Sequence, residues 1–166
     1  MKARRLFIVL GMVAVMIMAL APAASAADLI VVATQPTFAK AGPWVDFLKS
    51  KEVPVKNVAP SDLASFKDEP YVVLMGGMDE AGGIKSLAEK ALSKSEFEWI
   101  QKAGNNTMYL KYDVWYGGQE VMIFAGADGA GAEAARKGSR DEWWSTIMEW
   151  FEIEEEGGAE GGTPSY

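Results

Sequence analysis

Two unbroken apolar runs predict strands that are buried on both faces. The first run lies within the segment 28–34, between Asp28 and Thr34, the second covers 71–75, and both contain β-branched side chains. Runs of this kind are typical of parallel strands that helices cover on both sides. A shorter segment, 53–58, predicts a third strand, which Pro54 places at a sheet edge or at a strand start.

The segment 107–115 has a different pattern, because apolar and polar side chains alternate along it. A period of two predicts a strand with one wetter face. The tight connection 116–119 contains two glycines, and the apolar residues of 120–125 follow it. The pair predicts a β-hairpin, so we expect a mixed sheet.

Helical periodicity predicts five helices between and after these strands. They cover 43–51, 84–92, 95–102, a segment ending near 137, and 141–151. Strands and helices thus alternate along most of the chain. The predicted fold is a single three-layer α/β sandwich, with helices on both faces of a mixed four- to five-stranded sheet and a C-terminal hairpin strand pair.

The N-terminal residues 1–26 have the three parts of a secretory signal peptide. A basic start is followed by an apolar run over 6–20, and Ala24-Ser25-Ala26 supplies small residues for cleavage. An uncleaved N-terminal anchor is the alternative. We therefore expect a secreted or otherwise extracytoplasmic protein, with an α/β domain over 27–152 and a disordered acidic, glycine-rich tail over 153–166.

The balance of charge narrows the classes of partner. Removing 1–26 takes Lys2, Arg4 and Arg5 from the 16 basic residues and none of the 23 acidic ones, so the formal net charge falls from −7 to −10. Nucleic acids and anionic lipid surfaces select for basic patches, which argues against both as partners.

The chain contains no Cys and no His, which narrows the chemistry further. Cysteine nucleophiles, Ser-His-Asp triads and His or Cys metal sites are excluded. No recognisable catalytic motif remains, and we expect a protein that is not an enzyme.

A glycine-rich loop, 76–83, follows the second buried strand and raises the question of phosphate binding. The spacing Gly77…Gly82 matches a P-loop, but the Lys-Ser or Lys-Thr that must follow is missing. Asp79 and Glu80 would also repel phosphate oxygens. The loop is better interpreted as a strand-to-helix turn in which the acids favour the next helix N-terminus.

Asp128, in the loop after the last strand, extends this acidic set. Asp79, Glu80 and Asp128 all follow strands whose carboxyl ends meet at one edge, where open α/β sheets bind ligands. Three carboxylates with loop carbonyls would supply oxygen ligands for Ca²⁺. The open alternative is that these acids only cap helices.

Two further features concern the surface. The stripe Trp143, Trp144 and Trp150, which is too wide to bury completely, predicts an interaction surface in addition to core packing. Asn105-Asn106-Thr107 is a sequon, so Asn105 is a candidate glycosylation site.

Two glycine-containing strand ends carry a family resemblance. Val73-Leu-Met-Gly-Gly77 and Val121-Met-Ile-Phe-Ala-Gly126, the second followed by Asp128, Gly131 and Ala134-Ala-Arg136, resemble motifs of the α/β domain of archaeal surface-layer and related exported proteins. The resemblance covers about 71–136. It departs at Met78, where Pro is usual, and at 132–133, where Thr-Arg is usual. It implies an envelope-associated structural module without catalytic residues.

Together these features predict an exported, non-enzymatic α/β domain with a structural or binding role at the cell envelope. Its expected partners are an envelope protein, a glycan or a second copy of the chain. One alternative is a small-ligand or Ca²⁺-binding protein that uses the acidic strand-end loops. Another is a hydrolase that uses a pair of carboxylates.

Overall fold

The structure is a computed structural model that describes residues 27–154. The predicted signal peptide, 1–26, and most of the predicted tail, 155–166, lie outside the described residues. Between 27 and 154, no helix combines the length and the apolar character needed to cross a membrane.

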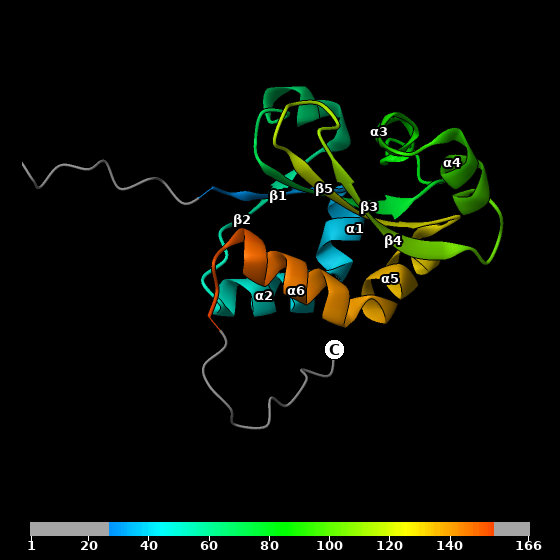
Figure 1. Cartoon of the computed structure of the whole chain (residues 1–166). Helices are drawn as coiled ribbons and strands as arrows, with labels where there is room; N and C mark the ends of the chain where they lie inside the picture. The colour runs from blue at the N-terminus through cyan, green and yellow to red at the C-terminus, as the bar shows by residue number, and fades with distance from the viewer. Residues whose placement is uncertain (1–26, 155–166) are drawn as a thin grey trace, which may run out of the picture.

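Strands and helices alternate along the described chain (Figure 1). The strands are β1 (Leu29–Val32), β2 (Val55–Val58), β3 (Tyr71–Gly77), β4 (Asn106–Tyr112) and β5 (Glu120–Gly126). The helices are α1 (Gln35–Lys40), α2 (Gly42–Ser50), α3 (Lys85–Ala91), α4 (Lys94–Ile100), α5 (Gly129–Gly138) and α6 (Arg140–Trp150), with a 3₁₀ helix, η1, at Pro60–Ser65.

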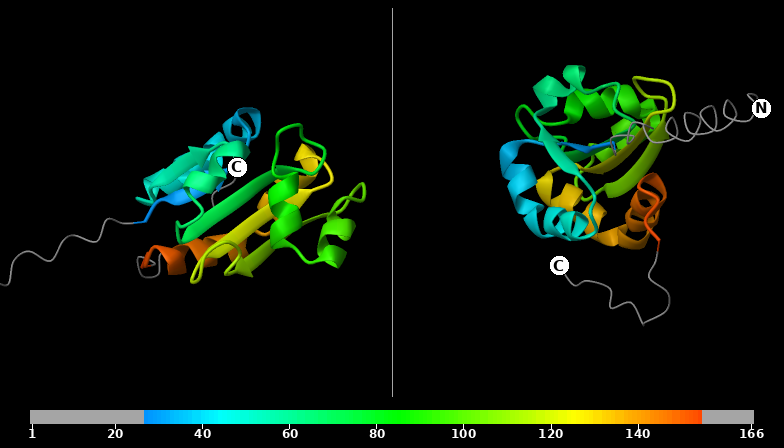
Figure 2. Two further views of the ribbon diagram at one scale, coloured as in Figure 1. Left: turned by 90° about the horizontal axis from the view of Figure 1, so that it is seen from above. Right: turned by 90° about the vertical axis from the view of Figure 1, so that its left-hand side faces the viewer.

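The five strands form one mixed sheet in the order β2-β1-β3-β5-β4. β2, β1, β3 and β5 are parallel, and β4 runs antiparallel to β5 as the first strand of the predicted hairpin. β2 and β4 are the two edges (Figure 2). The α/β fold with a mixed five-stranded sheet is thereby confirmed, including the edge position of the strand after Pro54.

Two hydrophobic clusters hold helices on opposite faces of the sheet (Figures 1 and 2). The first joins alternate residues of the central strands, such as Leu29 and Phe124, to α2 and α6. The second joins the intervening residues, such as Ile30 and Ile123, to η1, α3 and α4. Because successive strand side chains point to opposite faces, each continuous apolar run supplies both clusters.

Three local features differ from the sequence expectation. Hydrophobic periodicity does not predict α1, because none of the residues of this helix is buried. The side chain of Thr34 caps its N-terminus. α4 begins at Lys94, one residue before the predicted start at 95, and Ser93 caps it in a capping box with Glu96. Ile153, assigned to the tail, packs against the first cluster, so the folded domain extends past residue 152.

Candidate functional site

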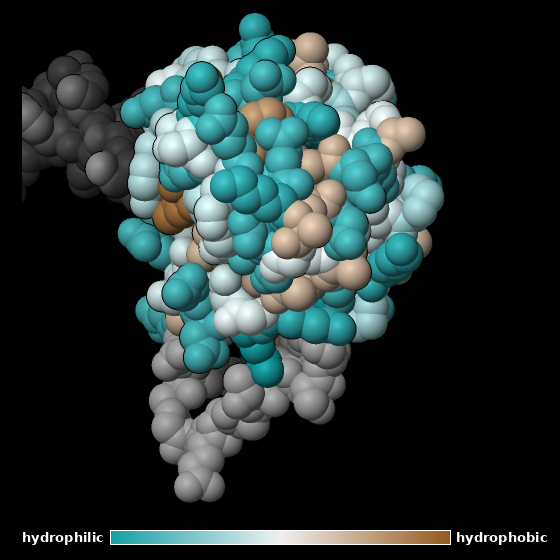
Figure 3. Space-filling model, turned by 90° about the vertical axis from the view of Figure 1, so that its right-hand side faces the viewer, coloured by the Kyte–Doolittle hydropathy of each residue, from teal (hydrophilic) through white to brown (hydrophobic). Residues whose placement is uncertain are grey.

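The carboxyl ends of β1 and β3 form the topological switch point of the sheet. The chain leaves β1 toward α1 and α2 on one face and leaves β3 toward α3 on the other. In open α/β sheets, ligands bind where neighbouring loops diverge in this way. Figure 3 shows the molecule from the side on which the parallel strands end, where polar side chains surround smaller apolar areas.

Glu80 occupies this switch point and links its two loops. Its Oε1 accepts a hydrogen bond from Thr37 Oγ1 at 2.7 Å and a second, very close one from Thr34 Oγ1. Thr34 lies two residues after the end of β1 and caps α1. The carboxylate therefore fixes the loop after β3 to the first turn of α1.

The second carboxylate oxygen of Glu80 is in a different situation. Oε2 is buried and accepts no hydrogen bond from the described residues. A Cβ at Gly76 would lie 2.8 Å from this oxygen, so glycine at 76 leaves the room that the carboxylate occupies. A buried acceptor without a donor costs free energy, which makes Oε2 the one atom of this cluster suited to an incoming donor.

The loops after β3 and β5 approach each other through their backbones. A Cβ at Gly77 would lie 2.4 Å from the Asp128 carbonyl carbon, and one at Gly126 would lie 2.4 Å from the Gly131 carbonyl carbon. Met78 N also donates to Gly126 O at 3.0 Å. Gly77 is therefore required where the end of β3 meets the loop after β5, and Gly126 is required where β5 packs against the first turn of its own helix α5.

The three acids predicted to bind Ca²⁺ have separate roles. Asp79 is exposed, Glu80 contacts Thr34 and Thr37, and Asp128 caps α5 by accepting from Gly131 N at 2.7 Å. Across residues 27–154, no group of three or more acidic side chains is placed to hold a metal ion. The structure therefore does not bring the three carboxylates together, because Glu80 and Asp128 each bind a different part of the fold.

Two of the three tryptophans predicted to form an interaction surface are buried. Trp143 is 1% exposed and Trp150 is 6% exposed, and both belong to the first cluster. Their indole nitrogens donate to Arg136 O and to Glu120 Oε2, each at 2.9 Å. Trp144 packs edge-on against Phe47 with 4.9 Å between ring centroids. α6 packs beside α2 on the same face of the sheet, so Trp143 and Trp150 belong to the core, while Trp144 stays half-buried.

Asn105, the candidate glycosylation site, lies between α4 and β4 and is half-buried. Its Nδ2, the atom that would carry a glycan, donates to Trp99 O at 2.8 Å. Its backbone carbonyl accepts from Ala127 N at 3.3 Å. In the folded chain this side chain fixes the α4–β4 turn to the helix.

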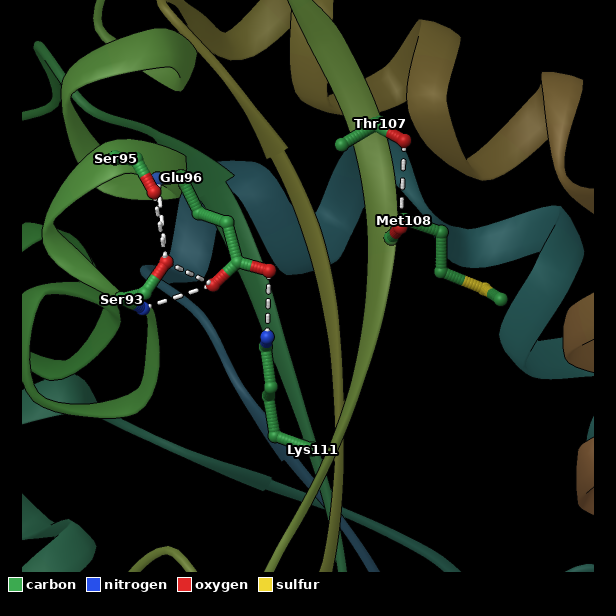
Figure 4. Close-up of polar contacts among 6 residues, drawn as sticks. All are labelled: Ser93, Ser95, Glu96, Thr107, Met108 and Lys111. Atoms are coloured by element: carbon green, nitrogen blue, oxygen red, sulfur yellow. Dashed lines mark hydrogen bonds and ion pairs between the residues drawn. The ribbon is translucent and has the colours of Figure 1, made fainter.

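A second region, which the sequence analysis did not single out, is the open edge of the sheet at β4. Lys111 on this strand donates to Glu96 Oε1 on α4 at 2.7 Å, and Ser93 binds the other oxygen of the same carboxylate (Figure 4). These hydrogen bonds, first from Lys111 and then from Ser93, lower the pKa of Glu96 to about 2. The single charged side chain of β4 is therefore neutralised at close range.

The residues that sequence reasoning missed are of two kinds. Thr34 and Thr37 are 43 or more positions from Glu80 in the sequence, and only the fold brings them into contact with it. The sequence does hold a signal for the pair Ser93 and Glu96, because Ser-x-x-Glu before an apolar stretch is the capping-box pattern. No such local signal marks the contact of Glu96 with Lys111.

Comparison of the chain with protein-family models, with curated proteins and with solved structures gave no match.

Proposed function

We propose that the protein is an exported, non-enzymatic α/β domain that acts through a binding or structural contact at the cell envelope. The observation that carries the proposal is the contrast between two borders of the sheet. At the carboxyl border, Glu80 and Asp128 bind parts of their own fold. At the β4 border, a seven-residue strand lies at the edge of the sheet.

Several sequence features support this assignment. Residues 1–26 have the pattern of a signal peptide, and the two glycine-rich strand ends resemble those of surface-layer domains. An open edge strand is a ready template for a partner strand, which suits a contact with protein. The expected partner is an envelope protein, a glycan or another copy of the chain.

The test combines location with binding. In the source cells, we expect antibody against the domain to detect the protein in the envelope or extracellular fraction, with Ala27 as its N-terminal residue by mass spectrometry. Purified protein should also bind isolated envelopes saturably in a sedimentation assay. Protein that stays in the cytoplasm with Met1 attached would contradict the proposal.

A second candidate function is small-ligand binding at Glu80, which the unpaired Oε2 favours. A ligand with a hydrogen-bond donor or a cationic group would satisfy this oxygen. Calorimetric titration with Ca²⁺ tests the metal version, and the same titration of Glu80→Gln is its control. A hydrolase with paired carboxylates receives less support, because Glu80 accepts hydrogen bonds from two threonine hydroxyls and not from a second carboxyl group.

A further inference from the structure

The two edges of the sheet are protected to different degrees. β2 has four residues, follows Pro54 and exposes Lys56, which are common protections against unwanted strand pairing. β4 has seven residues and no proline or glycine, and all of them are half-buried or exposed. Among residues 27–154, β5 is the only strand that pairs with β4.

The hydrogen bonds around the hairpin show which backbone groups of β4 face outward. Asn105 O accepts from Ala127 N, and Asp113 N donates to Gln119 O, so the odd-numbered positions face β5. Gly126 O and Glu120 N form hydrogen bonds on the β3 side of β5. The residues that pair with them on β4, Asn106 and Tyr112, therefore direct their backbone groups away from β5. The amides and carbonyls of Asn106, Met108, Leu110 and Tyr112 therefore point away from the sheet.

Apolar side chains of β4 pack against both hydrophobic clusters of the domain. Met108 and Leu110 pack against the first cluster, and Tyr109 packs against the second, yet all three stay partly exposed. Tyr112 is 62% exposed. A strand added beside β4 would cover these side chains and extend both clusters.

The charge on β4 favours a second copy of the same strand as that neighbour. The chain has a formal net charge of −7, but Asn106–Tyr112 contains no acidic residue. Its one basic residue, Lys111, is already paired with Glu96. Two copies would therefore meet at β4 without the repulsion that the rest of their acidic surfaces would produce.

We propose that two copies of the chain form a twofold-symmetric dimer by antiparallel pairing of β4 with β4. In the register of full overlap, Asn106 pairs with Tyr112 of the second copy and Met108 with its Leu110. The four outward residues then make about eight backbone hydrogen bonds, two for each bonded pair. The twofold axis passes between the two Tyr109 residues, and the contact is isologous, as in most homodimers.

This inference deepens the proposed function, since it names the partner at the open edge. The test uses protein expressed with its N-terminal segment in an exporting host and purified in the form recovered. Sedimentation equilibrium should show a reversible dimer. A concentration-independent monomer would overturn the proposal and leave the edge to a strand of another protein.

The absence of cysteine from the chain makes the register directly measurable. Across the proposed axis, the two residues at 109 form a non-hydrogen-bonded pair with Cα atoms about 4.5 Å apart, within disulfide reach. Tyr109→Cys should therefore cross-link on mild oxidation. Thr107→Cys is the matched control, because its two copies would lie about 13 Å apart along the strands. Equal cross-linking of both variants would overturn the proposed register.

A charge at the edge gives an independent check. Leu110→Lys should weaken the dimer about tenfold or more, because each copy would place a buried charge beside Met108 of the other. Tyr116→Lys adds the same charge at an exposed turn position and should leave the dissociation constant unchanged. Circular dichroism confirms folding, and if Leu110→Lys does not fold, the cysteine pair decides the outcome.

The two proposals fail in different ways. A purified dimer that is never found at the envelope would remove the proposed function and leave the dimer. An envelope-bound protein that stays monomeric would remove the proposed dimer and leave the proposed function.

Discussion

At the scale of single residues, the carboxyl edge of the sheet depends on glycines and on one glutamate. Gly76 leaves room for the Glu80 carboxylate, and Gly77 allows the β3 and β5 loops to touch. These residues explain the glycine-rich loop without a phosphate. Substitutions of Glu80 and Gly77 therefore have predictable effects on the free energy of unfolding.

Replacing Glu80 with Ala should lower the free energy of unfolding by about 1–3 kcal/mol, because two hydroxyl hydrogen bonds to a charged group are lost. Urea unfolding followed by fluorescence measures the change. Asp79→Ala, at the exposed neighbouring acid, should change stability by about 0.5 kcal/mol or less. A more stable Glu80→Ala variant would show that the carboxylate is held at a cost, and would favour the ligand-binding candidate.

Gly77→Ala should destabilise the protein by about 1–3 kcal/mol, because the new methyl group would meet the Asp128 backbone at 2.4 Å. The matched control is Gly129→Ala, where nothing lies within 4 Å of the added Cβ. That helical position should be neutral or gain up to about 1 kcal/mol from alanine's propensity. Thermal unfolding of both variants measures the contrast, and equal effects would refute the close approach of the loops.

At the scale of elements, the contact between α4 and β4 sets the geometry of the open edge. Glu96 accepts from Ser93 at the helix N-terminus and from Lys111 on the strand. One side chain therefore caps α4 and also positions β4 against it. The lowered pKa of Glu96 makes this link dependent on pH.

The pKa of Glu96 falls from its ordinary value of 4.5 to about 2, so its contribution to stability is present above pH 4.5 and is lost as the pH falls toward 2. Glu96→Gln retains a capping acceptor but removes the charge. At pH 7 it should cost about 0.5–1 kcal/mol, since the pair is about a quarter to a third exposed and screened by solvent.

Urea unfolding at pH 7 and near pH 2 measures this difference, which should shrink toward zero at the lower pH. Glu98→Gln is the control, because the Lys94–Glu98 pair is far more exposed and should contribute about 0.5 kcal/mol or less. A difference between wild type and Glu96→Gln that persists near pH 2 would contradict the assignment of the effect to charge.

Most elements with a buried periodic face could be predicted from the sequence, and elements without one could not. The runs at β1 and β3 are fully apolar, and the alternation along β4 was visible. α1 has no buried residue, so no periodicity marks it. The stripe of α6 predicted burial of one face, but the sequence could not show that α2 and the sheet together bury Trp143 and Trp150.

At the scale of the whole molecule, the candidate site was only partly predictable. Sequence order alone placed the glycine-rich strand ends at one border of the sheet, as the topology confirms. It could not show that Glu80 turns to Thr34 and Thr37, because that contact spans more than 40 positions. Nor could it show which strand would be the open edge, since strand order follows from long-range pairing.

The central claim is that the domain binds through the open edge at β4, with a second copy as partner. Amide hydrogen exchange, measured by NMR as protein concentration is raised, tests it most directly. The amides of Met108 and Leu110 point outward and should exchange quickly in dilute protein, then slow markedly as the dimer forms. Those of Tyr109 and Lys111, which face β5, should stay protected throughout. Fast exchange at Met108 and Leu110 at every concentration would contradict the claim.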